Sequence, residues 1–309
     1  SSGVANFESA TRTANPFWAM GLLALRKSLT NRAFLHVTLT NAKIFRAHTE
    51  SKNREIPTLV QFPDGHELEK LVPGFMQRHK IGGTTHRIGY ILWGLSASGY
   101  DPDTITDAAV YELSGLQLRN GSWVSDAHRP PTEYSPFSAT AVSVLGLMHY
   151  GPAGLKPQLQ RQIKRARTWL ESTTPHEHQE TAFRLLGLKW AGSSKDTIDQ
   201  ACQQLIAVQN EDGGWSQLPN LPSDAYATGL SLYALHVAGN IPVDAGSYEQ
   251  GVDFLLRTQN HPGVWRVESR SYGFQPYFES GFPFGEDQWI SSAAAGWATT
   301  ALLFAAEKQ

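Results

Sequence analysis

Gln117-Leu118-Arg119-Asn120-Gly121-Ser122-Trp123 is the first of three copies of one phrase in this 309-residue chain. The phrase returns as QNEDGGW at Gln209–Trp215 and as QNHPGVW at Gln259–Trp265, so all three copies fit the pattern QxxxGxW. A period of about 46 to 50 residues, with one degenerate copy between the first and second phrases, accounts for the spacing of all three copies. A repeat of that length is typical of proteins built from stacked units. The sequence therefore predicts a repeat fold.

Each copy of the phrase stands between two different helical patterns. Before it, apolar residues recur every three to four positions, as at Ile198, Ala201 and Leu205, which predicts an amphipathic outer helix. After it comes a more apolar segment rich in small residues, such as ATAVSVLGL at 139–147, which predicts an inner helix. The glycine of the phrase can take positive φ and end the outer helix, while the tryptophan packs across the turn. We therefore expect the phrase to join an outer helix to the next inner one.

Six segments have the inner-helix pattern, and about six outer helices accompany them. The predicted inner helices are Pro16 to Lys27, Arg87 to Ser98, Phe137 to His149, Glu180 to Trp190, Ala225 to Ala238 and Gln288 to Ala306. Six inner and six outer helices would close a ring. The predicted fold class is all-α, a single (α/α)6 barrel, or toroid, over residues 1–309. We expect an irregular unit at about 38–83, where prolines and glycines interrupt the helical pattern.

Composition limits the partners of this chain. Its formal charge is −2 and only 17% of its residues are charged, so no basic surface for nucleic acid is predicted. The single cysteine, Cys202, excludes an internal disulfide and cysteine-rich metal sites, and it favours a reducing, cytoplasmic location. No run of about 18 apolar residues predicts a membrane span, and no obligate protein partner is evident. The dense aromatic residues of 272–285 indicate either a lid over one end of the ring or a peripheral membrane contact.

The three QxxxGxW phrases and the small-residue inner segments resemble the terpene cyclase and prenyltransferase superfamily over roughly residues 85–306. The squalene–hopene cyclase group and the single-domain class II meroterpenoid cyclases are similar in plan. This resemblance implies an α/α barrel whose lumen binds a hydrophobic isoprenoid or prenylated small molecule. It also implies a protonation-initiated cyclisation that uses a buried carboxylic acid and neither a metal nor another cofactor.

The acid of such a reaction must stay protonated until it acts, and burial and neighbouring negative charges achieve this by raising the pKa of a carboxyl group. The superfamily usually supplies the acid with DxDDTA at the start of an inner helix, and this chain has no DxDD. The inner segments share a register marked by a Thr and a following small residue. The four positions before Thr181 hold Glu177-His178-Gln179-Glu180, and the four before Thr228 hold Asp224-Ala225-Tyr226-Ala227. We predict Asp224, Glu180 and Glu177 as candidate acids, with His178 beside them. The structural alternatives are a helix N-cap for Asp224 and ordinary first-turn acids for the two glutamates.

The other part of such a site is an apolar, aromatic lumen that shields cations from water and supports them through ring faces. Aromatic and polar residues on predicted inner helices, or at the starts of those helices, are the candidates for substrate binding. They are Trp18, His86, Trp93, Tyr226, Tyr233, Phe278, Glu279, Asp287, Trp289 and Trp297. Core packing between the two helix layers is the alternative for each aromatic residue, because only one face of an inner helix lines the lumen.

Two other functions stay open from the sequence. Protein prenyltransferases hold zinc on the same kind of ring through Asp-x-Cys and a later His, and the resemblance places His178, Glu180 and Ala227 at those positions, so that zinc site is missing. A different metal site could use His178, Glu180 and Asp224, since one His and two carboxylates can bind Zn²⁺ or Fe²⁺. A barrel that binds a hydrophobic ligand or a partner without catalysis is the other alternative.

Overall fold

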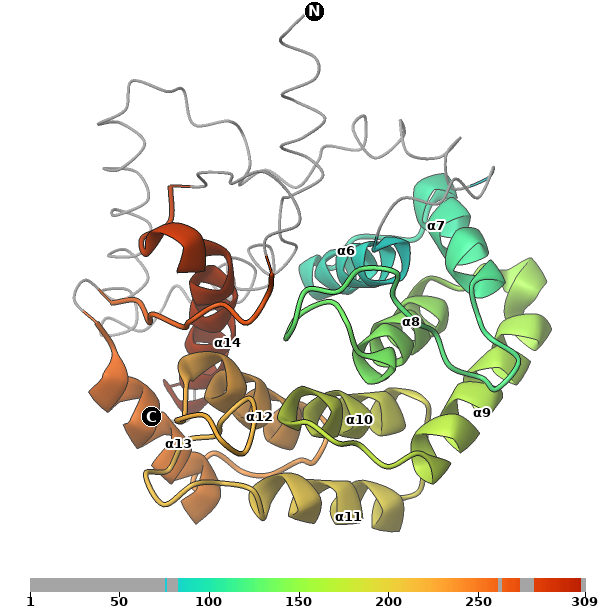
Figure 1. Ribbon diagram of the computed structural model, residues 1–309. Helices are drawn as coiled ribbons and strands as arrows, with labels where there is room; N and C mark the ends of the chain where they lie inside the picture. Colours follow the sequence, from blue (N-terminus) through green and yellow to red (C-terminus); the bar gives the residue numbers. More distant parts are fainter. Residues whose placement is uncertain (1–75, 77–82, 261–262, 273–280, 307–309) are drawn as a thin grey trace, which may run out of the picture.

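The computed structural model describes residues 76, 83–260, 263–272 and 281–306, and its helices form two curved layers, one inside the other (Figure 1). The inner layer consists of α6 (Thr84–Ser98), α8 (Pro136–Tyr150), α10 (His178–Trp190), α12 (Ala225–Val237) and α14 (Gln288–Ala306). The outer layer consists of α7 (Thr104–Gly115), α9 (Lys156–Ser172), α11 (Lys195–Ile206) and α13 (Gly246–Thr258). Two short 3-10 turns, η1 (Ala153–Leu155) and η2 (Gly285–Asp287), precede α9 and α14. These ranges contain no β-strand.

Inner and outer helices alternate along the chain, as the sequence predicts for an all-α fold of the α/α-barrel class. Five of the six predicted inner helices start and end within three residues of an observed helix. The sixth, Pro16 to Lys27, lies outside the described residues, as does the irregular unit at 38–83 apart from Met76 and Gly83. The single-domain span of 1–309 therefore stays a prediction.

The two layers differ in how much of each helix is buried. In outer helix α9 the buried residues are Leu159, Gln162, Ala166 and Leu170, and their spacing of three to four puts one stripe against the inner layer. Inner helix α8 is buried at every position from Phe137 to Leu147. Its residues are mostly small and apolar on every side, because two outer helices, two inner neighbours and the ring interior all contact it.

Glycines let neighbouring inner helices approach each other closely. A Cβ added to Gly229 of α12 would lie 2.5 Å from the backbone nitrogen of Ala298 in α14. A Cβ added to Gly89 of α6 would overlap the Val142 side chain of α8. A close-packed interior has no room for either atom. The small residues that mark the inner segments in the sequence are therefore required by helix packing.

The glutamine of a QxxxGxW phrase connects successive outer helices. Gln209, which follows α11, donates from its side-chain amide to the carbonyls of Gly213 and of Ser247 in α13, at 2.8 and 2.9 Å. The first copy makes the equivalent two bonds between the end of α7 and α9. Gly213 has a φ of 85°, and a Cβ there would lie 2.5 Å from the Gln250 carbonyl oxygen. The position therefore needs glycine both for its backbone conformation and for the close approach of α13.

The tryptophan of the phrase connects an outer helix to the next inner one. The Trp215 indole N–H donates to the Leu205 carbonyl of α11 at 2.8 Å, and the Trp215 backbone N–H donates to the Thr228 hydroxyl of α12 at 2.9 Å. Trp123 makes both bonds in the first copy, and Trp265 makes the indole bond in the third. The phrase is thus a junction between the layers, as the sequence predicts.

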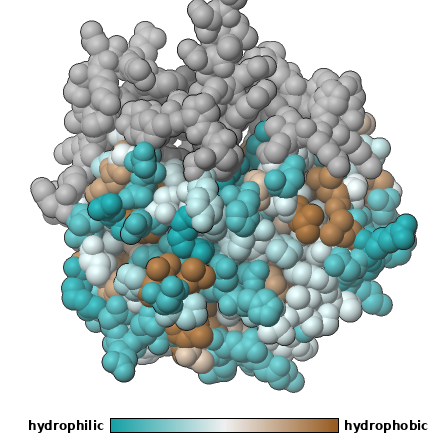
Figure 2. Space-filling model, viewed as in Figure 1, coloured by the Kyte–Doolittle hydropathy of each residue, from teal (hydrophilic) through white to brown (hydrophobic). Residues whose placement is uncertain are grey.

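The surface of the described part is mostly hydrophilic on the face in Figure 2, where hydrophobic residues form separate patches. One stretch, Gly285–Ala306, is long and apolar enough to cross a membrane by length and composition alone, yet 72% of its apolar window is buried inside the fold. That burial is what an inner helix requires. In the aromatic segment 272–285, Tyr272 is 87% exposed and residues 273–280 lie outside the described ranges, so the membrane contact stays a prediction.

Candidate active site

The inner helices begin at a common end of the ring, because an outer helix carries the chain back between each inner helix and the next. Polar side chains join these helix starts to one another. The His86 Nε2 of α6 lies 2.8 Å from the Ser138 hydroxyl of α8. The Ser135 hydroxyl, at the N-cap of α8, donates to the Glu180 carboxylate of α10 at 3.0 Å. We call the starts of α6, α8, α10 and α12, with the loops that contact them, the mouth.

A hydrogen-bonded chain crosses the mouth and connects two of the predicted acids. Arg270 pairs with the Glu177 carboxylate at 3.4 Å, and its Nε donates to the Gln217 side-chain oxygen at 2.8 Å. The Gln217 amide in turn donates to Asp224 at 3.0 Å. The Tyr134 hydroxyl donates to Glu177 from the other side. Glu177 and Asp224 therefore belong to one network through Arg270 and Gln217, two residues that the sequence analysis missed.

Asp224 caps a helix and is also readily protonated. Burial raises the pKa of Asp224 to about 6. This happens although one carboxylate oxygen accepts from the backbone N–H groups of Tyr226 and Ala227, at 2.8 and 2.9 Å, and these bonds and the one from Gln217 favour the anion. The two predicted roles of Asp224, N-cap and candidate acid, are therefore compatible.

Glu180 and Glu177 hold the start of α10 in place. Glu180 is only 9% exposed, and its two oxygens accept from the Ser135 hydroxyl at 3.0 Å and from the His176 backbone N–H at 2.8 Å. Glu177 accepts from Tyr134 and pairs with Arg270, and 30% of its side chain is exposed. Both glutamates thus connect α10 to neighbouring segments. Glu180 is also a first-turn acid, as the structural alternative predicts, whereas Glu177 stands at the N-cap position of α10.

The two buried histidines of the mouth are neutral. Burial, and to a smaller extent the charge of Arg129, lowers the pKa of His86 to about 3. Burial and the charge of Arg270 lower the pKa of His178 to the same value. The His178 Nε2 lies 2.6 Å from the Ser231 hydroxyl of α12. His178 therefore links α10 to α12, and its neutral ring supplies no positive charge to the acids.

A partly buried ion pair in the loop between α7 and α8 adds another acid to the mouth. Arg129 and Glu133 pair through their side chains, and their backbone groups exchange hydrogen bonds at 3.0 and 2.9 Å. Burial raises the pKa of Glu133, and the charge of Arg129 opposes that change. The Tyr90 hydroxyl of α6 donates to the Thr132 carbonyl of the same loop at 3.2 Å. The loop is thus fastened to α6, with the charge of Glu133 matched by Arg129.

Trp93 of α6 lies at the centre of an aromatic cluster inside the ring. Its ring centroid is 5.0 Å from that of Trp190 and 6.4 Å from that of Phe183, both on α10. It is 5.7 Å from Tyr233 of α12 and 5.7 Å from Trp297 of α14. A side chain that contacts three other inner helices must point into the interior and not toward the outer layer. The geometry therefore places Trp93, Tyr233 and Trp297 on the interior side, while ligand binding by them stays a prediction.

The interior becomes more polar from this cluster toward the mouth. On α6, His86, Tyr90 and Trp93 follow one another on a single face, with stacked rings at centroid distances of 5.8 and 6.2 Å. On α12, Tyr226 lies about two turns before Tyr233 on the same face. Both helices therefore present aromatic rings deep in the interior and hydrogen-bonding groups near their starts.

Tyr90, Phe183 and Gln179 are interior residues that the sequence analysis missed as binding candidates. Tyr90 lies four residues after the predicted His86, and Phe183 lies four residues after Gln179 on α10. A spacing of four keeps residues on one face of a helix. Looking one helical turn further along the chain from each predicted lining residue would therefore have found Tyr90. Phe183 and Gln179 had no predicted lining residue on their own helix to extend from.

Asp287 and Trp289 hold the segment that follows the third QxxxGxW phrase. The Asp287 carboxylate pairs with Arg266 at 2.9 Å and accepts from the Ser269 backbone N–H at 2.8 Å. The Trp289 indole N–H donates to the Ser269 hydroxyl at 3.2 Å. These contacts give both residues a structural role at the start of α14. The remaining candidates, Trp18, Phe278 and Glu279, lie outside the described residues.

The residues of the alternative metal site do not form a common set of ligands. His178 contacts Ser231, Glu180 contacts Ser135, and Asp224 caps its own helix. Within residues 83–260, 263–272 and 281–306, no group of three or more His, Cys, Asp and Glu side chains could hold a metal ion. The donor groups present therefore do not fit the metal-dependent alternative.

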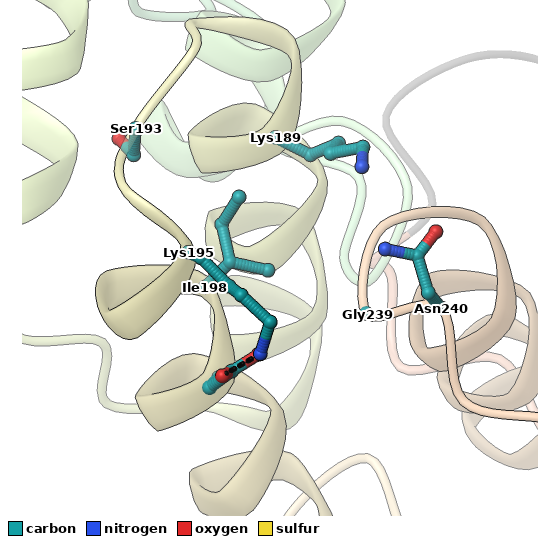
Figure 3. A pocket seen from close by; sticks show the side chains of 7 residues that line it. Lys189, Ser193, Lys195, Ile198, Gly239 and Asn240 are labelled. Carbon is teal, nitrogen blue, oxygen red and sulfur yellow. Dashed lines mark hydrogen bonds and ion pairs between the residues drawn. The ribbon is translucent and has the colours of Figure 1, made fainter.

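A surface pocket of about 550 Å³ lies at the opposite end of α10 from the mouth (Figure 3). The residues that line it are Lys189, Ser193, Lys195, Ile198, Asp199, Gly239 and Asn240. Lys189 is the second-last residue of α10, and Lys195 is already paired with Asp199. None of the predicted site residues lines this pocket, so it is separate from the mouth.

Two curated proteins are similar to parts of this chain, although no protein-family profile matches it. It is 34% identical over 112 residues to squalene–hopene cyclase of Bradyrhizobium diazoefficiens, a match that covers 32% of this chain and 16% of that protein. It is 34% identical over 86 residues to drimenyl diphosphate synthase of Streptantibioticus cattleyicolor, covering 28% of this chain and 15% of that protein. Segments of this chain are similar to these two enzymes. The matched segments span less than one fifth of the length of either relative.

Solved structures of terpene cyclases align with this chain over nearly its whole length. Type II terpene cyclase MstE from Scytonema, in complex with geranylgeranyl dihydroxybenzoate, is 16% identical with a TM-score of 0.48, and the alignment covers 97% of this chain and 99% of that one. Its apo form is 14% identical with a TM-score of 0.49, covering 97% and 100%. The resemblance to terpene cyclases that the QxxxGxW phrases predict is confirmed by the two matched sequence segments.

Proposed function

We propose that this chain is an enzyme, a class II-like terpene or meroterpenoid cyclase that starts the cyclisation of an isoprenoid chain by protonation. The observation that carries the proposal is the combination of one readily protonated acid, Asp224, with an aromatic interior around Trp93. Relatives named squalene–hopene cyclase and drimenyl diphosphate synthase support the same class of reaction. The ligand in this proposal is a hydrophobic isoprenoid or a prenylated small molecule.

Asp224 supplies the initiating proton in this mechanism. Its raised pKa of about 6 keeps part of the population protonated close to neutral pH. As the acid acts, its O–H bond breaks and the proton forms a bond to a terminal alkene carbon or to an epoxide oxygen. Loss of a proton from the final carbocation returns a proton to the site, so the overall reaction is an isomerisation with no other reactant.

The carboxylate left on Asp224 is stabilised by donors that are already in place. The backbone N–H groups of Tyr226 and Ala227 and the amide of Gln217 all donate to it. Because these dipoles are fixed before the proton leaves, they need no reorganisation when the negative charge develops. Arg270 orients Gln217 through its own hydrogen bond and favours the anion by its positive charge.

The aromatic cluster stabilises the carbocations and excludes water. A cation over the face of Trp, Tyr or Phe gains roughly 0.5–2 kcal/mol, and several rings meet around Trp93. The rings are also buried, which keeps water from trapping a cation early. The distribution of polar and aromatic residues therefore fits protonation near the mouth and ring closure deeper inside.

Product analysis tests the proposal directly. The purified protein is incubated with squalene, with geranylgeranyl diphosphate and with a prenylated dihydroxybenzoate, and the products are examined by mass spectrometry for cyclic isomers of unchanged mass. Asp224→Asn keeps an N-cap side chain but cannot give up a proton, so product formation should fall by about a hundredfold or more. Glu180→Gln is the matched carboxylate control and should keep most of the activity. Equal activity of wild type and Asp224→Asn would reject Asp224 as the acid.

A barrel that binds its ligand without catalysis is the second candidate function. The absence of DxDD favours it, and so does the use of Asp224 as an N-cap. In this case isoprenoids should raise the melting temperature of the protein while no cyclic product forms from any of them. Asp224→Asn should then leave ligand affinity unchanged.

A further inference from the structure

Gln179 at the mouth has a buried side-chain amide, and neither its oxygen nor its nitrogen has a hydrogen-bond partner among the described residues. The residue is only 1% exposed. Buried polar groups in proteins are nearly always hydrogen-bonded, because leaving one unpaired costs the free energy of removing it from water. A partner that belongs to a ligand would satisfy this amide.

Gln179 lies on the interior face of α10. Its two neighbours turn to opposite sides, since His178 contacts α12 and Glu180 contacts α8. One helical turn further on, the Phe183 ring lies 6.4 Å from the ring of Trp93 in the interior. Residues four apart share a helix face, so Gln179 occupies the same face as Phe183, nearer the mouth.

Tyr226 of α12 presents a second unsatisfied group on the interior side. It is fully buried, and its hydroxyl proton has no acceptor among the residues that the structure describes. The Trp297 side chain lies next to it, but an indole N–H can only donate. Tyr226 shares a face of α12 with Tyr233, whose ring lies 5.7 Å from the ring of Trp93 in the interior. Tyr226 therefore offers a free donor toward the same space.

We propose that Gln179 and Tyr226 bind a neutral oxygen group, an epoxide or a hydroxyl, on the isoprenoid ligand. An ether or hydroxyl oxygen can accept from the Tyr226 phenol and from the Gln179 amide nitrogen, and a hydroxyl can also donate to the Gln179 oxygen. The inference rests on the proposed function only in taking an isoprenoid as the ligand. It makes these two side chains specificity-determining residues.

The charge of the surroundings favours a neutral oxygen over a diphosphate. Burial raises the pKa of Tyr226 far above neutrality and lowers that of His86 to about 3, so both side chains are uncharged. Arg270, whose positive charge acts on Asp224, is already paired with Glu177. A diphosphate would therefore be buried without adequate countercharge, and a plain hydrocarbon would leave Gln179 unpaired.

Binding measurements with matched ligands test the proposal. Dissociation constants are measured from tryptophan fluorescence for squalene and its terminal epoxide, and for geranylgeraniol and the hydrocarbon that lacks its hydroxyl. In the squalene pair the oxygen is at the end of the chain that would be protonated, and in the geranylgeraniol pair it is at the head of the chain. The two pairs therefore show which position of the oxygen the site recognises. In at least one pair the oxygen-bearing ligand should bind roughly tenfold more tightly. Geranylgeranyl diphosphate should bind more weakly than geranylgeraniol.

Two variants connect that preference to the named side chains. Gln179→Met, which is close in volume, and Tyr226→Phe should each reduce the preference for oxygen while leaving the affinity for the hydrocarbons unchanged. Gln179→Met should also melt at the same or a higher temperature, because it removes an unpaired buried amide. Tyr248→Phe is the matched control. Its hydroxyl donates from outer helix α13 to the Ala301 carbonyl of α14, between the two layers, so the substitution should lower the melting temperature without altering the preference.

Equal affinity within both ligand pairs would overturn the proposal, as would a preference for oxygen that survives both substitutions or a diphosphate that binds most tightly. A clearly lower melting temperature for Gln179→Met would show that the amide is already paired in the free protein, which also overturns it. Since none of these readouts needs turnover, a preserved preference without any cyclic product would reject the proposed cyclase function alone.

Discussion

The ring of Trp93 in α6 lies 5.7 Å from the ring of Trp297 in α14, although these are the first and last inner helices that the structure describes. The contact joins the two ends of the inner layer across the interior. Trp93 also contacts α10 and α12, so its side chain fills the centre of the ring of helices at the depth of this cluster. A bound chain therefore has to lie between this cluster and the mouth, or displace the rings as it enters.

Trp93→Ala should destabilise the fold strongly, because it removes the side chain that five other aromatic rings contact. The expected loss in the free energy of unfolding is about 3–5 kcal/mol, as is usual for removal of a buried Trp. Urea denaturation measures it. Leu256→Ala, at a residue that is 54% exposed, is the control and should change stability by less than about 0.5 kcal/mol. A similar loss in both variants would mean that the cluster is not part of the core.

Gly213→Ala should cost stability for two separate reasons. The residue has a φ of 85°, and the new Cβ would lie 2.5 Å from the Gln250 carbonyl oxygen. Positive φ in a residue other than glycine costs about 1–3 kcal/mol, before any shift of α13. Gly246→Ala at the start of α13 has open space around its Cβ and should be neutral or slightly stabilising. Thermal unfolding of the two variants compares them, and the reverse order would contradict the role assigned to the repeat glycine.

Asp224 should make the protein less stable as the pH rises from about 4 to about 6. Its folded-state pKa of about 6 lies above the ordinary 3.8, so the native state holds the extra proton in this window and loses stability as the proton leaves. The loss is at most about 3 kcal/mol. Asp224→Asn keeps the N-cap and should remove this part of the pH dependence, as measured by urea midpoints across the window. An unchanged pH dependence in the variant would contradict the raised pKa.

Asp103→Asn is the matched control for that experiment. Asp103 also caps a helix and accepts from two backbone N–H groups, those of Ile105 and Thr106. Burial would raise the pKa of Asp103, but its hydrogen bonds, the one from Tyr100 foremost, hold it below 3.8. Its stabilising contribution is therefore present above the ordinary pKa and is lost as the pH falls below it. The two aspartates should give pH dependences of opposite sign.

Arg270→Met should move the protonation of Asp224 to higher pH. The positive charge of Arg270 lowers the pKa of Asp224, so removing that charge should raise it further. The high-pH limb of the activity profile should shift upward, and so should the Asp224 carboxyl titration measured by NMR. Arg266→Met is the control, because Arg266 pairs with Asp287. A profile that shifts equally in both variants would indicate a general charge effect and not the link through Gln217.

Much of the fold could be predicted from the sequence because its determinants are local. Helix periodicity depends on residues three to four apart, and two bonds, the one from Gln209 to Gly213 and the one from the Trp215 indole to Leu205, recur in all three copies of the phrase. The register marked by Thr228 also holds, since its hydroxyl accepts from the Trp215 backbone. Each of these features lies within one repeat or between adjacent repeats, so the chain order already encodes it.

The candidate site could be predicted only in part. Asp224, Glu177 and Trp93 are identified by their place in the register, but nothing near them in sequence indicates Arg270 or Gln217. Arg270 pairs with Glu177 across several helices, and a contact between residues so far apart leaves no periodic signal. The same holds for the unpaired amide of Gln179, whose lack of a partner is a property of everything packed around it.

The sequence by itself determined the repeat, the alternation of outer and inner helices, and the end of the ring at which the acids gather. Only the tertiary structure decided which acid is readily protonated and which residues face the interior. The physical reason is that ionisation and orientation depend on burial and on neighbours from other repeats. In the sequence Asp224 is either a candidate acid or an N-cap, and it is the surrounding fold that raises its pKa to about 6.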